Sequence, residues 1–317
     1  MSHAHPLRGV LYLLGGLLMF ACMDTTVKYL TASYSVPLIF AVRYGVNLLL
    51  ITAIFAPRQG RHLIETNRTG LVLLRGACLA CVSLAVGFAL QRMPVAETTA
   101  IGYVAPLIIV LAAGPLLGER VGWVGWTAAV LGFAGVLLIV RPGSGLEPFG
   151  VACALGAAVF NAAYQLLSRL LATTERTRAL LFYTALIGTL AFGAVVPWFL
   201  GDRAPSVVEM LLFLMVGSFG TIGHWFLTTA YTHADASLLA PMTYLQLLWA
   251  GLFGWLIFDH LPDLVSLLGM AIVAASGVLI ALKTRAPLPV SAQDDPDIVE
   301  IPSDQVDREP NPGGARL

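Results

Sequence analysis

The sequence predicts an all-α polytopic membrane protein whose ten transmembrane helices form two inverted five-helix repeats. Three observations support this fold class. First, 58% of the 317 residues are hydrophobic and 11% are charged, with a mean hydropathy of +0.82, whereas soluble domains carry about a quarter charged residues. Second, ten apolar segments of membrane-spanning length follow one another along the chain. Third, the last part of each half of the chain contains acidic, hydroxyl and glycine residues in the same order.

The apolar segments are the expected helices, because a helix needs about 20 mainly apolar residues to cross a hydrocarbon core about 30 Å thick. They are 9–30, 36–56, 70–91, 97–117, 121–141, 149–170, 178–200, 207–230, 237–258 and 264–283. Residues 1–8 form a short N-terminal extension, and the first span is interpreted as an uncleaved helix because no small-residue cleavage site follows it. Residues 284–317 are rich in Pro, Asp and Ser, and we predict that they form a disordered tail.

The basic residues predict the orientation of the helices. Lys plus Arg and Asp plus Glu both number 18, so the net charge gives no reason to expect a nucleic-acid partner. With the N-terminus inside, the cytoplasmic flanks carry Arg8, Arg58, Arg61, Arg68, Arg75, Arg120, Arg169, Arg176, Arg178, Lys283 and Arg285. The opposite side carries Lys28, Arg92, Arg141 and Arg203. The positive-inside bias therefore predicts a multi-pass protein of the bacterial inner membrane with both termini in the cytoplasm.

The four cysteines, Cys22, Cys78, Cys81 and Cys153, all lie in apolar runs. A metal or redox site needs ionisable thiolates, which a lipid-surrounded helix disfavours. We interpret the one close pair, Cys78 and Cys81, as packing residues, and we expect no metal site and no cofactor.

An internal repeat is the strongest pattern in the chain. Residues 95–140 and 233–282 each contain, in the same order, an acid with hydroxyl residues, one helix, an acidic turn and a Gly-Val-Leu run. The acids are Glu97 and Asp235, and the acidic turns are Glu119-Arg120 and Asp259-His260. The Gly-Val-Leu runs begin at Gly135 and Gly277. A weaker echo sets 20–30 beside 160–170. The first repeat would span 9–141 and the second 149–283. Because five spans is an odd number, the second copy would be inverted, which is typical of alternating-access carriers.

Three stretches of sequence also resemble a known family. FACMDTTVK (20–28), AGVLLIVRP (134–142) and ADASLLAPMTYLQLLWAGLFGWLIFD (234–259) are similar to motifs of the EamA family of the drug/metabolite transporter superfamily. The resemblance extends over nearly the whole chain up to about residue 283. It implies a carrier with two five-helix modules, in a family whose members export or import amino acids, riboflavin, S-adenosylmethionine, sugars or metallophores. The motifs indicate the family and do not select a substrate.

Charged residues within the first two spans have two open interpretations. Asp24 and Lys28 lie four residues apart near the outer end of the first span, and Arg43 lies at a similar depth in the second. Such a charge costs about 2.5–3.5 kcal/mol at a helix centre, so it usually faces the bundle interior and has a partner. In one hypothesis Asp24 and Arg43 form a buried ion pair, while Lys28 pairs with Asp24 or extends to the headgroups. In the other, Arg43 binds the solute and Asp24 couples transport to protons.

Further polar and aromatic side chains lie at helical spacing inside the spans. We predict that the solute is bound by Arg43, Asn47, Tyr103, Asn161, Tyr164, Gln165, Tyr244, Gln246 and Trp249. The alternative is that these side chains pack the core or form interhelical hydrogen bonds. Pro106, Pro115 and Pro241 are positions where a span can bend or break.

These patterns predict a secondary transporter and not an enzyme, since no GxxxxGK[ST], G-x-S-x-G or H-E-x-x-H motif occurs. The expected cargo is a small polar or zwitterionic metabolite, such as an amino-acid-derived compound or a metallophore, moved by alternating access with export slightly favoured. One alternative is uptake of riboflavin, S-adenosylmethionine or a similar aromatic metabolite, and a second is a channel. The expected partners are the solute and the lipid bilayer, and a homodimer is left open.

Overall fold

The computed structural model describes residues 6–60, 64–117, 123–141, 143–171, 174–201, 203–234, 239 and 242–283. All regular structure within these ranges is helical. The predicted tail (284–317) lies outside the described residues, as do three residues of the repeat plan, Glu119, Arg120 and Asp235.

The helices fall into two halves of the chain. The first half forms α1 (Pro6–Thr31), α2 (Val36–Gln59), α3 (Thr69–Arg92), α4 (Val95–Gly102), α5 (Ala105–Leu117) and α6 (Trp123–Ile139). The second forms α7 (Pro148–Leu171), α8 (Thr177–Val195), η2 (Val196–Trp198), α9 (Val207–His233), η3 (Thr243–Leu245), α11 (Gln246–Phe258) and α12 (Leu264–Lys283). Six helices, α1, α2, α3, α7, α8 and α9, are long and apolar enough to cross a membrane, and four shorter apolar segments lie at the remaining predicted spans.

The outer surface of the bundle is apolar. Leu49, Val130 and Leu248 are 72%, 65% and 68% exposed although each lies within a helix. A soluble monomer rarely leaves large contiguous apolar patches in water. Together with the six long apolar helices, this surface identifies a membrane protein.

The fourth and ninth predicted spans are not continuous helices. The expected span 97–117 is divided into α4 and α5, with Tyr103 and Val104 between them. Pro106 lies in the first turn of α5, where a missing N–H costs no intrahelical hydrogen bond. In the expected span 237–258, the 3₁₀ turn η3 precedes α11. Both halves therefore contain irregular backbone at the corresponding span.

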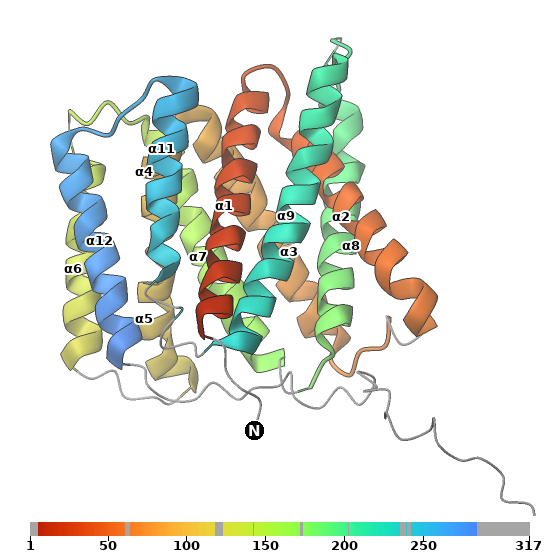
Figure 1. Cartoon of the computed structure of the whole chain (residues 1–317), viewed down its shortest axis with the longest axis horizontal. Helices are drawn as coiled ribbons and strands as arrows, with labels where there is room; N and C mark the ends of the chain where they lie inside the picture. The colour runs from red at the N-terminus through yellow and green to blue at the C-terminus, as the bar shows by residue number, and fades with distance from the viewer. Residues whose placement is uncertain are drawn as a thin grey trace, which may run out of the picture.

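Helices of the two halves pack against each other in a symmetric pattern (Figure 1). The most extensive contacts join α1 to α9, α3 to α7, α6 to α12 and α2 to α8. By chain order α1 corresponds to α7, α2 to α8, α3 to α9, α4 and α5 to α11, and α6 to α12. Exchanging the halves converts the α1–α9 contact into the α7–α3 contact and leaves the α2–α8 and α6–α12 contacts unchanged. The pattern of packed pairs is thus preserved when the halves are exchanged.

Close approach of α6 and α12 requires glycine on both sides. A Cβ at Gly135 would lie 2.8 Å from the Gly269 carbonyl oxygen, and one at Gly269 would lie 2.6 Å from the Gly135 carbonyl oxygen. Neither distance is tolerable for a side chain. Small residues of this kind bring membrane helices into backbone contact.

Candidate functional site

The guanidinium of Arg43 on α2 is buried and largely without protein acceptors. The residue is 7% exposed, and its Nη1 donates to the Ser83 hydroxyl of α3 at 3.1 Å. Its carbon Cζ lies 5.3 Å from the ring centroids of both Phe40 and Tyr44. Its Nε is buried without a hydrogen-bond partner. Arginine side chains in membrane spans normally face the interior of the bundle, and this one does.

The expected contact ion pair between Asp24 and Arg43 is not formed. In the described part of the chain, no hydrogen bond or ion pair within 4.0 Å joins the two side chains, although the Arg43 charge acts on Asp24 at longer range. Lys28 does not pair with Asp24 either. Its Nζ donates to the carbonyl oxygens of Leu90 at 2.9 Å and Met93 at 2.7 Å. Lys28 therefore satisfies the C-terminal carbonyls of α3, which a helix leaves without intrahelical donors.

Arg75 on α3 is a buried cation that the sequence analysis placed among the cytoplasmic flanking residues. It is 6% exposed and lies in the second turn of α3. Its Nε donates to Ser168 at 2.7 Å, its Nη1 to Thr184 at 2.7 Å, and its Nη2 to Tyr164 at 2.7 Å. Nη1 also donates to the Leu180 carbonyl oxygen at 3.2 Å. Arg75 thus connects the first half to α7 and α8 of the second.

Distance from the end of a span could not separate Arg75 from a true flanking residue, because it lies only six positions after Thr69, where α3 begins. Only its hydrogen-bond partners could have distinguished Arg75 from a flanking residue. Tyr164 is one of the predicted binding residues of the sixth span, and the Arg75 guanidinium also lies over the Tyr164 ring at 4.5 Å. Nothing in the sequence paired Tyr164 with α3.

Asn47 lies on α2, one turn after Arg43. Its side-chain oxygen Oδ1 is buried and has no hydrogen-bond partner in the described structure. An unsatisfied buried polar atom costs about 1–3 kcal/mol. Arg43 and Asn47 therefore present an unused donor and an unused acceptor on one helix.

The two irregular segments meet through a pair of tyrosines. The rings of Tyr103, between α4 and α5, and Tyr244, in η3, have centroids 4.6 Å apart. The Tyr103 hydroxyl donates to the Thr243 carbonyl oxygen at 2.6 Å and lies 3.2 Å from the Gln246 Oε1. Three predicted binding residues are thus brought together at the break in each half.

The remaining predicted residues are more dispersed. Tyr164 contacts Arg75, while Asn161 and Gln165 lie on the same helix, α7, with Gln165 exposed. Trp249 packs with an apolar cluster around Leu13 and Leu17 of α1 and lies parallel to Phe253 at 6.2 Å. The structure therefore gives two groups, Arg43 with Asn47 and the tyrosine pair with Gln246, and does not bring Gln165 or Trp249 into either.

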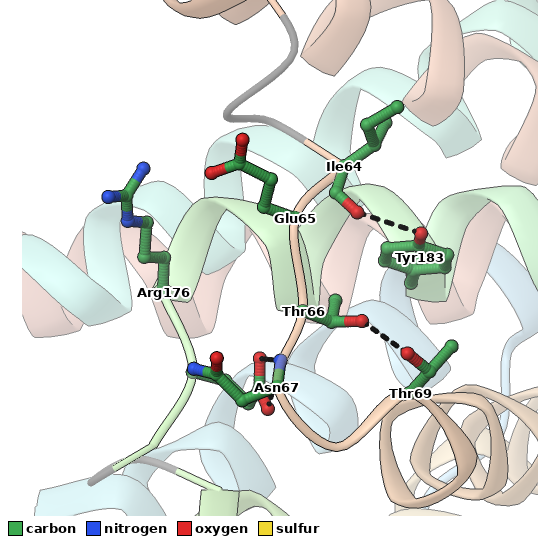
Figure 2. A pocket seen from close by; sticks show the side chains of 8 residues that line it. Ile64, Glu65, Thr66, Asn67, Thr69, Arg176 and Tyr183 are labelled. Atoms are coloured by element: carbon green, nitrogen blue, oxygen red, sulfur yellow. Dashed lines mark hydrogen bonds between the residues drawn. The ribbon is translucent and has the colours of Figure 1, made fainter.

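A cavity of about 550 Å³ lies at the end of the bundle where α3 begins (Figure 2). There the carboxylate of Glu175, from the α7–α8 connection, accepts the backbone N–H groups of Asn67 at 3.0 Å and Arg68 at 2.6 Å. Arg68 is the N-cap of α3 and makes no capping hydrogen bond with its own side chain. Figure 2 also shows Tyr183 donating to the Ile64 carbonyl oxygen, at 2.9 Å. Glu175 therefore caps a helix of the opposite half.

A second cavity, of about 580 Å³, lies between the two halves at the opposite end of the bundle. It lies between the α1–α2 and α8–α9 connections and the facing parts of α2 and α9. Tyr34, two residues before α2, takes the position that Glu175 has two residues before α8. The lining is mainly apolar: Tyr34, Leu38, Val42, Leu200, Gly201, Arg203, Ala204, Pro205, Met210, Phe213 and Leu214.

Two further acids near helix ends are paired. Glu97, which is 3% exposed at the start of α4, lies 3.0 Å from the His260 Nε2. Asp263 accepts the Ser266 backbone N–H at 2.7 Å and the Arg141 guanidinium at 2.5 Å. The Ser266 N–H first and then Arg141 lower the pKa of the Asp263 carboxyl to about 2. Within the described ranges, no group of three His, Cys, Asp or Glu side chains is arranged to hold a metal ion.

The fold and these buried polar groups define a multi-pass membrane protein built from two similar halves. The model of the EamA-like transporter family matches the chain twice, over residues 7–141 and 148–282. The chain therefore belongs to the EamA-like transporter family.

Three named transporters are similar to this chain over most of its length. A riboflavin transporter of Vibrio cholerae is 28% identical over 87% of this chain and 93% of its own. An S-adenosylmethionine uptake transporter of Rickettsia prowazekii is 25% identical, with coverage of 86% and 92%. The pseudopaline exporter CntI of Pseudomonas aeruginosa is 27% identical, with coverage of 86% and 93%. Family and relatives identify a transporter of a small metabolite, and their names describe no enzyme.

One solved crystal structure has the same fold, with a TM-score of 0.64 and 20% identity, and the match covers 86% of this chain and 96% of that one.

Proposed function

We propose that this chain is a secondary transporter that moves a small polar or zwitterionic metabolite across the bacterial inner membrane by alternating access. The observation that carries this proposal is the set of packed helix pairs, which is preserved when the two halves are exchanged. Two halves with five spans each would be related by an axis in the membrane plane. Such inverted repeats give inward-open and outward-open states built from the same contacts.

The binding site in this proposal lies where polar groups are left without protein partners and where helices are interrupted. Arg43 and Asn47 supply an unused donor and acceptor. Tyr103, Tyr244 and Gln246 lie at the interrupted spans. Discontinuous helices frame the substrate sites of many carriers, because irregular backbone inside a membrane must line a polar cavity or be buried in protein. Asn161, Tyr164, Gln165 and Trp249 complete the proposed lining.

The proposal also includes the direction of transport, the coupling ion and the oligomeric state. Both termini would face the cytoplasm, export is slightly favoured, and Asp24 would couple flux to protons. The named relatives include uptake systems and an exporter, so uptake of riboflavin or S-adenosylmethionine is the alternative reading. A homodimer is compatible with this scheme.

Counterflow in proteoliposomes tests the mechanism. A carrier loaded with unlabelled solute accumulates labelled solute transiently against its gradient, whereas a channel does not. The solutes are amino acids, riboflavin, S-adenosylmethionine and metal-chelating metabolites, chosen by thermal-shift screening of the purified protein. Saturable counterflow that Arg43→Gln abolishes supports the proposal. Flux through the wild type without counterflow would support the channel instead.

A further inference from the structure

We infer that the transported solute carries an acidic group, a carboxylate or an oxyanion of similar size, and that Arg43 binds it at the edge formed by Nε and Nη2. This inference rests on the proposed function and names the substrate class of that site. It depends on three features: two buried arginines without a contacting carboxylate, a guanidinium edge without acceptors, and a glycine, Gly220, that faces this edge.

The first feature is that two buried cations lack a contacting counter-ion. Arg43 and Arg75 are both buried, and neither makes an ion pair in the part of the chain that the structure describes. The acceptors of Arg75 are three hydroxyls and a carbonyl oxygen, all uncharged. The charge of Arg43 acts on Asp24 without contact. Neither guanidinium charge is therefore neutralised by a contacting carboxylate.

The other ionisable groups do not pair with these arginines either. The His224 ring on α9 packs edge-on against the Phe20 ring at 5.0 Å, and an ordinary imidazole is mostly uncharged at neutral pH. The buried carboxylates of Glu97 and Glu175 are engaged elsewhere, with His260 and with the N-terminus of α3. Arginine stays protonated in proteins, so neither guanidinium loses its charge.

The second feature is the difference between the two arginines. Arg75 uses Nε, Nη1 and Nη2 for hydrogen bonds to its own protein. Arg43 uses only Nη1. Its Nε is buried and unpartnered, and its Nη2 makes no hydrogen bond within the described residues. Nε and Nη2 form the edge that binds a carboxylate through two parallel hydrogen bonds. Arg75 therefore supplies fixed positive charge, and Arg43 supplies the open donor edge.

The third feature is the glycine that faces this edge. A Cβ at Gly220 of α9 would lie 3.5 Å from the Arg43 Nε and 3.7 Å from Nη2, in contact with both. Because position 220 is glycine, no side chain of that residue covers the two free donors. A larger residue at position 220 would touch the edge that an incoming carboxylate needs.

A tethered carboxylate tests the site without knowledge of the solute. Gly220→Asp places an acid beside the free edge, and Gly220→Asn is its neutral isostere. In both variants the new Cβ lies 3.3 Å from the Met23 sulfur. The steric cost of the added side chain is therefore the same in both and cancels in the comparison. We expect the Asp variant to melt about 2–4 °C above the Asn variant in detergent. The difference should disappear when both are combined with Arg43→Gln, as in a double-mutant cycle.

Solute preference forms the second arm of the experiment. Matched probes are L-tyrosine with L-tyrosinamide, and riboflavin 5′-phosphate with riboflavin. The acidic member should shift the wild-type melting temperature at a concentration at least about tenfold lower than its partner. That preference should be lost in Arg43→Gln.

The two arms separate failure of this inference from failure of the proposed function. If Gly220→Asp melts no higher than Gly220→Asn, or if the difference persists without Arg43, the acidic-group inference is wrong whatever the flux assays give. A preference for the uncharged probe would also overturn it. If the melting cycle behaves as expected and no solute shows counterflow, the anion site stands and the carrier mechanism fails.

Discussion

Replacing Glu175 with glutamine measures how strongly the α7–α8 connection holds the start of α3. Glu175 is 8% exposed, and its carboxylate accepts N–H groups from Asn67 and Arg68. A glutamine keeps an oxygen that can accept both N–H groups, but its NH₂ group then faces the Asn67 N–H, which also contacts the second carboxylate oxygen in the wild type. Hydrogen bonds to a charged group contribute about 1.5–3 kcal/mol, against about 0.5–1.5 kcal/mol for neutral ones. Across both donors, the free energy of unfolding should fall by about 2 kcal/mol.

The assay is thermal unfolding in detergent, followed with a thiol-reactive dye that reports exposure of Cys78, which is 8% exposed in the folded protein. A loss of about 2 kcal/mol lowers the melting temperature by roughly 3 °C, because the unfolding entropy of about 2.1 cal/mol/K per residue applies to a chain of 317 residues. The matched control is Asp259→Asn. Asp259 is exposed at the end of α11, and its φ of 52° is one that asparagine tolerates. Equal melting of the two variants would refute the capping role of Glu175.

Three further predictions follow from individual contacts. Arg75→Lys keeps the charge but cannot make all the hydrogen bonds of the guanidinium, so unfolding should become easier by about 3 kcal/mol in an SDS titration, with Arg75→Ala at least as severe. Tyr103→Phe removes the 2.6 Å bond to the Thr243 carbonyl oxygen and should lower solute affinity about fivefold by equilibrium binding; unchanged affinity would remove Tyr103 from the site. The wild type should lose stability as the pH falls from about 4 through the folded pKa of Asp263, about 2, and Asp263→Asn should lack this pH-dependent contribution. Melting curves from pH 5 to 2 measure this, and parallel curves would contradict it.

The sign of the last prediction follows from linkage. The folded pKa of Asp263 lies below its ordinary value of 3.8, so the ionised carboxylate favours the folded state. That contribution is present above the unfolded pKa and disappears as the pH falls through the folded pKa. Wild type and Asp263→Asn should therefore differ at pH 5 and converge at the acidic end.

The sequence predicted the helices well because apolar length is a local property. Within the described residues, six long and four shorter apolar helical regions lie at the predicted segments. The interruption at Tyr103 was not located, although Pro106 indicated a point where the span can break. A proline at the second position of a new helix and a proline that bends a continuous one look alike in sequence.

The buried charges were harder to place, because their partners come from distant parts of the chain. Asp24 and Lys28 are separated by one helical turn, which made their pairing reasonable. Lys28 instead reaches carbonyl oxygens more than sixty residues away. Arg75 interacts with α7 and α8, about ninety residues or more further along. Such contacts depend on which helices become neighbours, and apolar periodicity carries no information about that choice.

The carboxylate of Glu175 ties the two halves together at one end of the bundle, and the equivalent position at the other end holds the uncharged ring of Tyr34. In the proposed alternating-access mechanism, conformations that interchange the roles of the two ends would therefore differ in energy by roughly the strength of these hydrogen bonds. An empty molecule would then rest mostly in one conformation, and the return step without solute would be unequal in its two directions. In that mechanism a kinetic preference for one direction of transport arises from a single acid far from the bound solute.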